Sequence, residues 1–319
     1  MVLHQIASHL YAMGRDVFLT PREKDPWSPA ISKDVPVCPF EDLRLFPEDI
    51  WLVPEGWVNA LAPGLNAGAR CVVYCQNWAY LFSGLPENVR WKSLKVSFLA
   101  VSHPVALFLE RVLGDAPPVL RPGIDLSLFT PPEEKPSGPV RVAYMPRKNK
   151  AFVSQVRSIL EARGSRRARD VIWEEISGLD QEGVAQVFQR CHFFLVTGFP
   201  EGCPLPPLEA MACGCLPVGF AGFGGFDYMR QAGEPWDGAY VPWWPLREVP
   251  WGGNGFWVAD ADVLALALAL ERAVSWIPGH DNYHAALEAG QKTAHAYSLK
   301  KQRENVVQIW NNLAGEARE

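Results

Sequence analysis

Short apolar runs alternate along this chain with longer segments in which apolar residues recur every three to four positions. The short runs have the length and composition of buried strands, and the longer segments have the period of helices. A regular alternation of strands and helices is typical of a parallel sheet that helices cover on both faces. The pattern therefore predicts an α/β protein.

The predicted strands fall into two groups. The first group is 16–20, 49–54, 69–75 and 95–102, and the second is 140–146, 170–176, 192–198, 215–220 and a short strand opening 255–274. The predicted helices are the segment ending at Gly14, then 103–114, 151–164, 180–191, 206–214, the rest of 255–274 and everything from Gly279 on.

The segment 130–139 separates the two groups of strands. It holds four prolines and three charged residues in ten positions, which is the composition of a linker. We therefore expect two Rossmann-like halves. Ligands of such sheets bind beyond the carboxyl ends of the strands, so the cleft between the halves is the expected site.

Composition and charge argue against several classes of function. The chain has 319 residues and a formal charge of −5, so no basic surplus points to nucleic acid. The longest apolar run, eight residues from Val263, is far shorter than a membrane-spanning helix needs. We read no signal peptide, and seven cysteines without export signals favour reduced thiols. Neither close cysteine pair has the spacing of a zinc site, so we expect no metal.

The segment 199–225, which follows a predicted strand, carries the candidate chemistry. Glu201 stands in the loop, Pro206 and Pro207 suit the first turn of a helix, and Glu209 falls in or beside that turn. A helix N-terminus offers free N–H groups and positive potential to a diphosphate. A carboxylate beside it can accept hydrogen bonds from the two hydroxyls of a ribose. The pattern predicts a nucleoside-diphosphate pocket.

The run EGCPLPPLEAMACGCLPV (201–218) resembles the donor-site signature of family 4 of the retaining glycosyltransferases, which have the GT-B fold of two Rossmann-like domains facing across a cleft. That signature holds two glutamates eight positions apart, here Glu201 and Glu209. The resemblance extends to 121–131, 180–202, 254–269 and 296–313, and it covers roughly the last 200 residues.

The resemblance implies roles for individual residues. Glu201 would lie beside the donor sugar as the catalytic residue, and Glu209 would bind the ribose. Arg147 and Lys150 would neutralise the diphosphate, because cleavage of the sugar–phosphate bond leaves negative charge on the leaving group. The remaining donor-binding residues would be Gly202, Cys203, Leu205 and Pro206. With two cations and a helix terminus, no metal and no cofactor are expected.

The chain departs from the family in three places. Pro204 replaces a glycine of the common EGFG and removes one N–H near the donor sugar. The first strand of the N-terminal domain is apparently missing. Where the family often carries a cleft histidine, this chain has Gln76 and Asn77, with His103 as the alternative sugar or acceptor contact.

Other candidate residues have both a structural and a functional interpretation. Gly224 and Gly225 could approach a phosphate or simply turn the chain, and Asp227 is a weaker candidate for an acidic site residue. Three clustered tryptophans, Trp243, Trp244 and Trp251, are predicted to fill interfaces or the core, although such a loop could bind an acceptor. The apolar helix that starts near Val263 is also predicted to pack in the core.

The resemblance implies an acceptor domain at 1–129, a donor domain at 130–297 and a helix at 298–319 that crosses back to the first domain. We expect a cytoplasmic hexosyltransferase that moves a hexose or deoxyhexose from a nucleotide-diphosphate sugar to a glycan or lipid-linked acceptor, with retention of configuration. Neither nucleic acid nor a transmembrane segment is expected, while peripheral membrane association stays open. The alternatives are a nucleotide-sugar-binding protein that has lost transfer and a nucleotide-sugar epimerase of the same fold.

Overall fold

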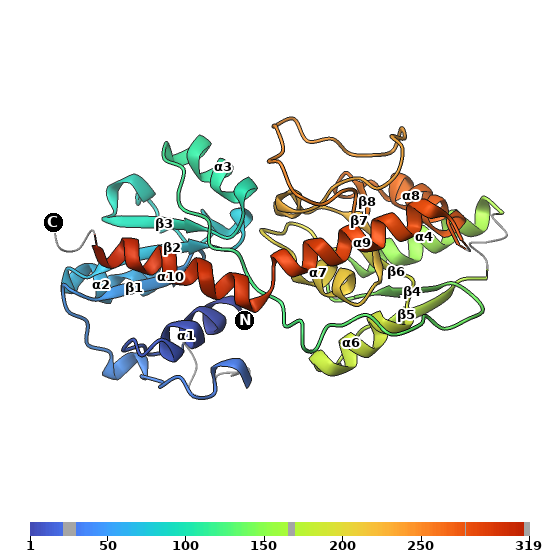
Figure 1. The fold of residues 1–319 in the computed structure, drawn as a ribbon. Coiled ribbons are helices and arrows are strands. Elements are labelled where there is room, and N and C mark those ends of the chain that lie inside the picture. Colours follow the sequence, from blue (N-terminus) through green and yellow to red (C-terminus); the bar gives the residue numbers. More distant parts are fainter. Residues whose placement is uncertain (22–29, 165–169, 278, 316–319) are drawn as a thin grey trace. The chain divides into compact units, whose positions relative to one another are not determined.

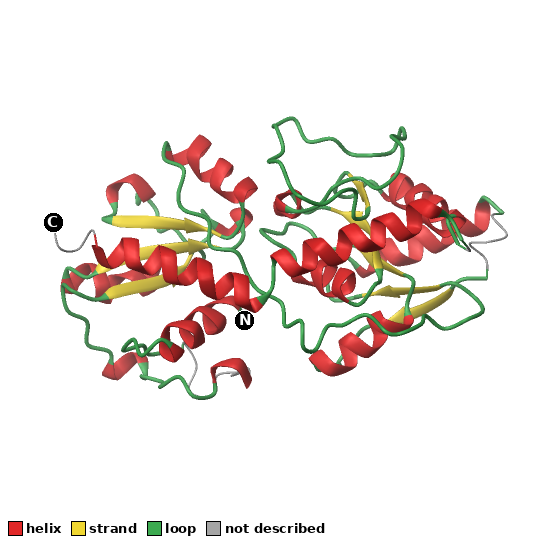
Figure 2. Cartoon of the chain, viewed as in Figure 1, coloured by secondary structure: helices red, strands yellow, loops and turns green. Residues whose placement is uncertain are grey.

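The computed structural model describes residues 1–21, 30–164, 170–277 and 279–315. The chain forms two compact units, of which unit 1 combines Met1–Gly123 with the residues from Leu299 on, and unit 2 is Ile124–Ser298. The first boundary lies after Gly123, whereas the sequence predicted it after residue 129. Figures 1 and 2 show that each unit contains a parallel sheet with helices against it.

Unit 1 is built on a three-stranded parallel sheet in the order β1-β2-β3. Its strands are β1 (Ile50–Pro54), β2 (Arg70–Cys75) and β3 (Val96–Ala100), and its helices are α1 (Val2–Ala12), α2 (Ala62–Ala67), α3 (His103–Leu113) and α10 (Leu299–Gly315). The first and last helices contact each other, and His9 of α1 is hydrogen-bonded to Gln302 of α10 at 3.1 Å. The last helix therefore packs with the N-terminal unit.

The predicted strand 16–20 is wrong. Only Leu19 pairs, through a single bridge to Val37. Pro21 follows on one side of the bridge, and Pro36 and Pro39 flank the other. Proline has no N–H to give to a ladder, so the pairing cannot extend.

Unit 2 contains a five-stranded parallel sheet in the order β5-β4-β6-β7-β8. The strands are β4 (Arg141–Tyr144), β5 (Ile172–Glu175), β6 (Phe193–Val196), β7 (Leu216–Phe220) and β8 (Phe256–Val258). The helices are α4 (Lys150–Ala162), α6 (Gln181–Arg190), α7 (Leu205–Ala212), α8 (Val263–Ser275) and α9 (Asp281–Ala296). Helices α4 and α8 pack together on one face of the sheet, and α6, α7 and α9 cover the other (Figure 1).

The core of unit 2 lies between the sheet and these helices. Every residue of β6, β7 and β8 is buried. The apolar helix α8 turns Leu266, Ala269, Leu270 and Ala273 into this core, which confirms the prediction for that segment. Because both faces of the sheet are covered, polar groups can gather only where the strands end.

The segment from Gly279, predicted to be helical throughout, forms two helices with a break at Tyr297 and Ser298. Helix α9 ends at Ala296 and α10 begins at Leu299. Between them the carbonyl of Tyr297 accepts the N–H of Ile124 at 2.8 Å, and Ser298 pairs with the same residue as a bridge. This pairing competes with helical hydrogen bonds where the chain leaves unit 2.

A lysine from the linker ties the C-terminal ends of two helices together. The ammonium of Lys135 donates to four carbonyls at 2.7–3.1 Å, those of Phe188, Gln189 and Cys191 at the end of α6 and of Cys213 at the end of α7. A cation there satisfies carbonyls that a helix leaves unpaired and opposes the negative end of each helix dipole. Burial lowers the pKa of Lys135, so the group is held there against a desolvation cost.

We predict that Lys135→Met lowers the free energy of unfolding by about 3 kcal/mol, because methionine leaves the helix-end carbonyls buried without a donor. Urea unfolding followed by circular dichroism measures the change. The matched control is Lys292→Met, since Lys292 is exposed and its 3.9 Å ion pair with Glu288 is weak. Equal stability of the two variants would contradict this role of Lys135.

Candidate functional site

Four neighbouring strands of unit 2 send their following loops to one place. Lys148 follows β4, Glu201 follows β6, Gly222 follows β7 and Asp260 follows β8. Because all the strands are parallel, these loops leave the same edge of the sheet. The hydrogen bonds and ion pair described below join all four residues.

The carboxylate of Glu201 forms an ion pair with Lys148 at 2.7 Å. The loop that carries Lys148 is fastened to the end of β6, where the Thr197 hydroxyl donates to the Lys148 carbonyl at 3.1 Å. The Asn149 side-chain amide donates in turn to the carbonyl of Thr197 at 2.8 Å. Asn149 adopts φ 58°, a left-handed conformation that asparagine tolerates better than most residues. The backbone therefore aims Lys148 at Glu201.

The two cations that the sequence predicted lie on either side of Lys148. Arg147 lines a small pocket of about 50 Å³ together with Lys148, Glu201 and Pro206. Lys150 is the first residue of α4 and does not line this pocket. Sequence reasoning missed Lys148, although the run RKNK (147–150) contained it. Spacing along a loop does not show which of three basic side chains turns toward the sheet edge.

The main chain of Glu201 is held on both sides by the loop after β7. Its N–H donates to the carbonyl of Gly222 at 2.9 Å, and its carbonyl accepts the N–H of Gly224 at 3.0 Å. A Cβ on Gly222 would lie 2.7 Å from the Cβ of Glu201, and one on Gly224 would lie 1.9 Å from the carbonyl oxygen of Gly202. Gly222 and Gly224 therefore allow two backbones to meet, which favours the structural reading of the 222–225 turn.

Asp260 supports the same turn. Its carboxylate accepts the N–H of Gly222 at 2.9 Å. Burial raises the pKa of Asp260, and the negative charge of Glu201 raises it further. Two carboxylates and one ammonium group thus share this edge of the sheet. Sequence reasoning missed Asp260, because no local signal links it to a residue almost sixty positions earlier.

Asp227, the weaker candidate, is fully buried. It accepts a hydrogen bond from the hydroxyl of Tyr297 at 2.5 Å and lies 3.3 Å from the guanidinium of Arg247. A carboxylate enclosed by these partners stabilises the loop structure. The site does not include it.

Helix α7 begins at Leu205, close to the predicted start. Its N-cap is Pro204, and the second and third helical residues are Pro206 and Pro207. These three residues have no N–H, so Leu205 supplies the single backbone donor among the four positions that normally offer one. The expectation of several free N–H groups at this helix end is therefore wrong. The helix dipole remains, but an anion here depends mainly on side-chain cations.

The loop between β6 and α7 is held from behind. The Tyr228 hydroxyl donates to the carbonyl of Pro204 at 2.7 Å in a buried contact. Gly202 and Cys203 are buried, while Leu205 and Pro206 are half-buried. Of these predicted donor-binding residues, Pro206 lines the small pocket.

Glu209 lies in the second turn of α7 and is half-buried. Burial alone raises the pKa of its carboxyl group to about 7. Among the residues that the structure describes, none forms a hydrogen bond or ion pair with this carboxylate. A half-buried acid without a partner is costly to ionise, and perturbed acids of this kind are typical of functional sites.

The N-terminal candidates belong to unit 1. The N–H groups of Gln76 and Asn77 donate to the buried carboxylate of Glu55 at 3.0 and 2.8 Å. The Asn77 side chain accepts the N–H of Ala79 at 3.1 Å, which makes it a cap of the short helical turn that follows. His103 is exposed at the start of α3. Glu55, which follows β1 and whose pKa burial raises, was missed by the sequence analysis.

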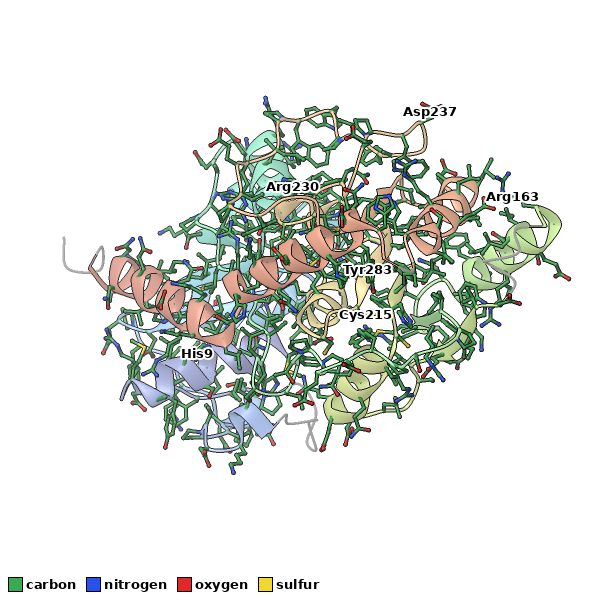
Figure 3. The ribbon with its side chains drawn as sticks, turned by 45° about the vertical axis from the view of Figure 1, so that its right-hand side comes forward. His9, Arg163, Cys215, Arg230, Asp237 and Tyr283 are labelled. Carbon is green, nitrogen blue, oxygen red and sulfur yellow. The ribbon has the colours of Figure 1, made fainter. Side chains whose placement is uncertain are left out.

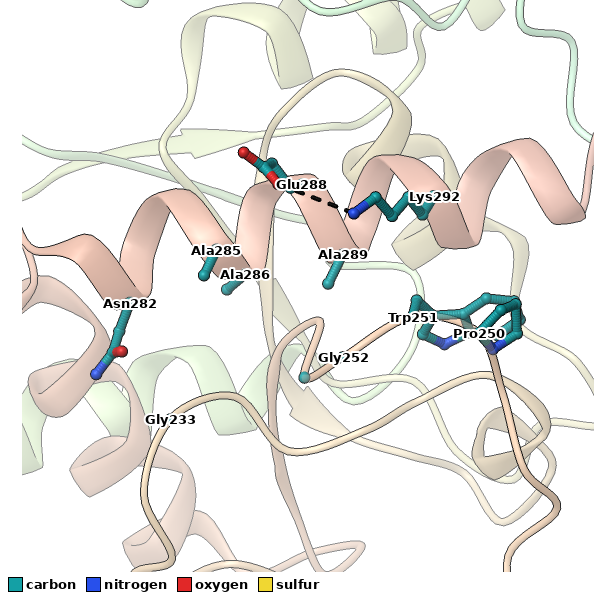
Figure 4. A pocket seen from close by; sticks show the side chains of 11 residues that line it. Gly233, Pro250, Trp251, Gly252, Asn282, Ala285, Ala286, Glu288, Ala289 and Lys292 are labelled. Carbon is teal, nitrogen blue, oxygen red and sulfur yellow. Dashed lines mark ion pairs between the residues drawn. The ribbon is translucent and has the colours of Figure 1, made fainter.

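A larger hollow of about 310 Å³ lies elsewhere in unit 2 (Figure 4). Its walls come from α9 and from the loops at Gly233 and 250–253. Alanines 285, 286 and 289 form much of one wall, and Glu288 and Lys292 are exposed at its rim. Of the candidate residues named from the sequence, Trp251 lines it, and the predicted catalytic and donor-binding residues do not. Size alone does not make it the site, because a binding site needs converging polar groups.

The described ranges lack two features, a membrane-spanning helix and a cluster of metal ligands. None of their helices combines the length and apolar content that crossing a membrane requires. They also hold no group of three or more His, Cys, Asp or Glu side chains placed to bind a metal.

We predict that Glu209→Gln raises the free energy of unfolding by about 2 kcal/mol at pH 8 and by less than about 1 kcal/mol at pH 5. The folded protein holds the Glu209 proton up to about pH 7, whereas the unfolded chain releases it near 4.5. Ionisation therefore costs stability as the pH rises through this window, and glutamine removes that cost. Urea unfolding at the two pH values measures it, and a gain that does not depend on pH would contradict it.

Comparison with known proteins supplies one curated relative and many solved structures. No family model matches the chain. An alpha-1,6-glucosyltransferase from Actinobacillus pleuropneumoniae serotype 7 is 25% identical over 187 residues, which cover 57% of this chain and 56% of that protein. The chain thus spans little more than half the length of this relative.

Three of the structural matches cover nearly all of the chain. Sucrose-phosphate synthase from Thermosynechococcus elongatus matches with a TM-score of 0.66 and 15% identity over 98% of this chain and 93% of that one. A glycosyltransferase from Rickettsia africae matches with a TM-score of 0.65 and 12% identity over 99% and 93% of the two chains. Anabaena HepE, solved in complex with UDP, matches with a TM-score of 0.62 and 13% identity over 98% and 95%. The chain therefore has the GT-B fold of these glycosyltransferases, with two Rossmann-like domains, as the sequence predicted.

Proposed function

We propose that this chain is a cytoplasmic glycosyltransferase that moves a hexose or deoxyhexose from a nucleotide-diphosphate sugar to a glycan or lipid-linked acceptor. The observation that carries the proposal is the meeting of four strand ends at the Glu201–Lys148 pair, within a GT-B fold. Ligands of parallel α/β sheets bind at this edge. We further propose that the reaction retains the configuration at the anomeric carbon and needs no metal.

UDP-glucose is the first donor to test. The relative that matches at 25% identity is named as a glucosyltransferase, and one structural neighbour was solved with UDP. Another neighbour, a starch synthase IV, was solved with ADP, so the base needs a direct comparison.

In the proposed reaction the bond between the anomeric carbon and the diphosphate oxygen breaks, and its electron pair leaves with the nucleoside diphosphate. The acceptor hydroxyl forms the new bond on the same face of the sugar and gives its proton to the departing phosphate. Fixed positive charge stabilises the leaving group in the transition state. We assign this charge to Arg147 and Lys148, which line the small pocket, because prolines remove most of the N–H donors at the start of α7.

Lys148 can serve two partners. An ammonium group has three N–H donors, and one of them is committed to Glu201. The others are available to a phosphate oxygen, so one side chain can hold both the leaving group and the carboxylate that orients the sugar. We assign Glu201 to the sugar hydroxyls and Glu209 to the ribose. The Glu209 carboxylate accepts hydrogen bonds best once it is ionised, above about pH 7.

We predict that one of UDP, GDP, ADP and dTDP raises the melting temperature by several degrees at 100 times its dissociation constant, since such binding adds about 2.7 kcal/mol. Lys148→Met should weaken that nucleotide about tenfold through loss of a charge-assisted contact to phosphate. Lys292→Met, an exposed lysine of α9, is the control and should leave it unchanged. A larger loss with Lys150→Met than with Lys148→Met would return the phosphate role to Lys150.

We predict that Glu201→Gln lowers turnover about a hundredfold while nucleotide affinity stays within threefold, because the carboxylate acts on the sugar and not on the nucleotide. The measurement is UDP release from UDP-glucose with a panel of oligosaccharide acceptors. Turnover equal to that of the unaltered protein would disprove the role of Glu201. Nucleotide binding without turnover for any donor would favour the alternative of an inactive binding protein.

A further inference from the structure

One tryptophan of the long loop between β7 and β8 is turned to solvent. Trp243 is 75% exposed, whereas Trp244 and Trp251 are 8% and 7% exposed. Trp244 and Trp251 therefore fill the core, as one of the two predicted roles requires, and Trp243 does not. The loop extends beyond the strands of unit 2 (Figure 1), and Figure 3 labels Arg230 and Asp237 along it.

The segment around Trp243 is stiff. Burial alternates along it, with Val241, Trp243 and Pro245 exposed and Pro242 and Trp244 buried. The backbone bends at Trp243 and Trp244, and exposed and buried side chains alternate through this bend. The two prolines restrict the backbone further. The indole of Trp243 is therefore turned to solvent, while that of its neighbour Trp244 is buried.

Both ends of this segment are anchored in unit 2. The N–H of Tyr240 donates to the carbonyl of Trp257 in β8 at 3.0 Å. Beyond the tryptophans, the carbonyl of Arg247 accepts a bond from Arg230 at 2.5 Å, and the Arg247 guanidinium donates to the carbonyl of Asp227 at 2.9 Å. The loop is therefore a fixed part of unit 2.

A chain of aromatic contacts joins Trp243 to the site. The rings of Trp243 and Trp244 meet edge to face with centroids 5.5 Å apart, and Trp244 packs on Phe223 at 4.9 Å. Phe223 pairs with Glu201 as a β-bridge. The exposed indole of Trp243 thus packs on Trp244, and Trp244 packs on the residue that pairs with the proposed catalytic glutamate.

We propose that Trp243 is a stacking platform for a pyranose ring of the carbohydrate acceptor, an inference that rests on the function proposed above. The C–H groups on one face of a pyranose carry partial positive charge, and the face of an aromatic ring is negative. A flat ring that packs on the buried Trp244 in an anchored loop gives contact area at little cost in conformational entropy. The acceptor is accordingly a glycan long enough to reach from the reacting hydroxyl to this ring.

The charge of the loop favours a carbohydrate over a lipid surface. Residues 233–253 contain three acidic residues, and their single Lys or Arg is Arg247. Arg247 is engaged by Asp227 and lies over the ring of Trp251 at 5.6 Å. Adsorption to anionic membranes relies on several exposed basic residues, which this loop does not carry.

The test compares Trp243→Ala and Trp243→Phe with two controls, Val241→Ala on the same loop and Leu179→Ala before α6. Both control residues are exposed, at 78% and 47%. The probes are maltotriose, isomaltotriose and cellotriose, and binding is measured by saturation-transfer NMR without donor. Thermal shift with UDP is measured on every variant.

At least one trisaccharide should bind the unaltered protein. Trp243→Ala should weaken it about tenfold, while the phenylalanine variant and both controls stay within threefold and the UDP shift is unchanged. Three results would overturn the inference. The first two are that no trisaccharide binds, or that Trp243→Ala binds the trisaccharide as well as the unaltered protein does. The third is that the unaltered protein binds phosphatidylcholine–phosphatidylglycerol vesicles and that Val241→Ala and Trp243→Ala weaken this binding equally. Trp243-dependent binding without any nucleotide shift would leave the platform standing and reject the proposed donor.

Discussion

The site of unit 2 depends on how the main chain of Glu201 is held between two neighbouring loops. Its N–H and carbonyl are both bonded to the turn at Gly222 and Gly224, and Asp260 holds that turn from the next strand. The loop after β4 completes the arrangement by bringing Lys148 within 2.7 Å of the carboxylate. Each of these contacts exists only because the strands are parallel and end at the same edge.

Burial raises the pKa values of two carboxyl groups of unit 2. The pKa of Glu209 rises to about 7, and the pKa of Asp260 is raised by burial and by the charge of Glu201. Ionising the buried carboxyl group of Glu209 lowers stability, and the rest of unit 2 offsets this cost through its buried sheet and the Lys135 contacts. A protein under selection for stability alone would replace Glu209 with a neutral side chain.

The proline-rich start of α7 shifts anion recognition from backbone to side chains. Three prolines leave Leu205 as the donor of that turn, while Arg147 and Lys148 line the adjacent pocket. Side-chain cations attract phosphate over a longer range than a neutral N–H, but they are screened more strongly by salt. Prolines also flank the exposed tryptophan of the long loop, where Pro242 and Pro245 restrict the backbone around Trp243.

The sequence alone determined the α/β class, the strands of both sheets apart from 16–20, and the segment around Glu201 and Glu209, because these follow from local periodicity and from residues close together in the chain. Tertiary structure decided which basic residue meets Glu201, since Lys148 is chosen by bonds from Thr197 and Asn149 that belong to different loops. It also decided the part played by Asp260 and which tryptophan of the loop stays in solvent. Those outcomes depend on contacts between residues far apart in sequence, and periodicity within one segment carries no information about them.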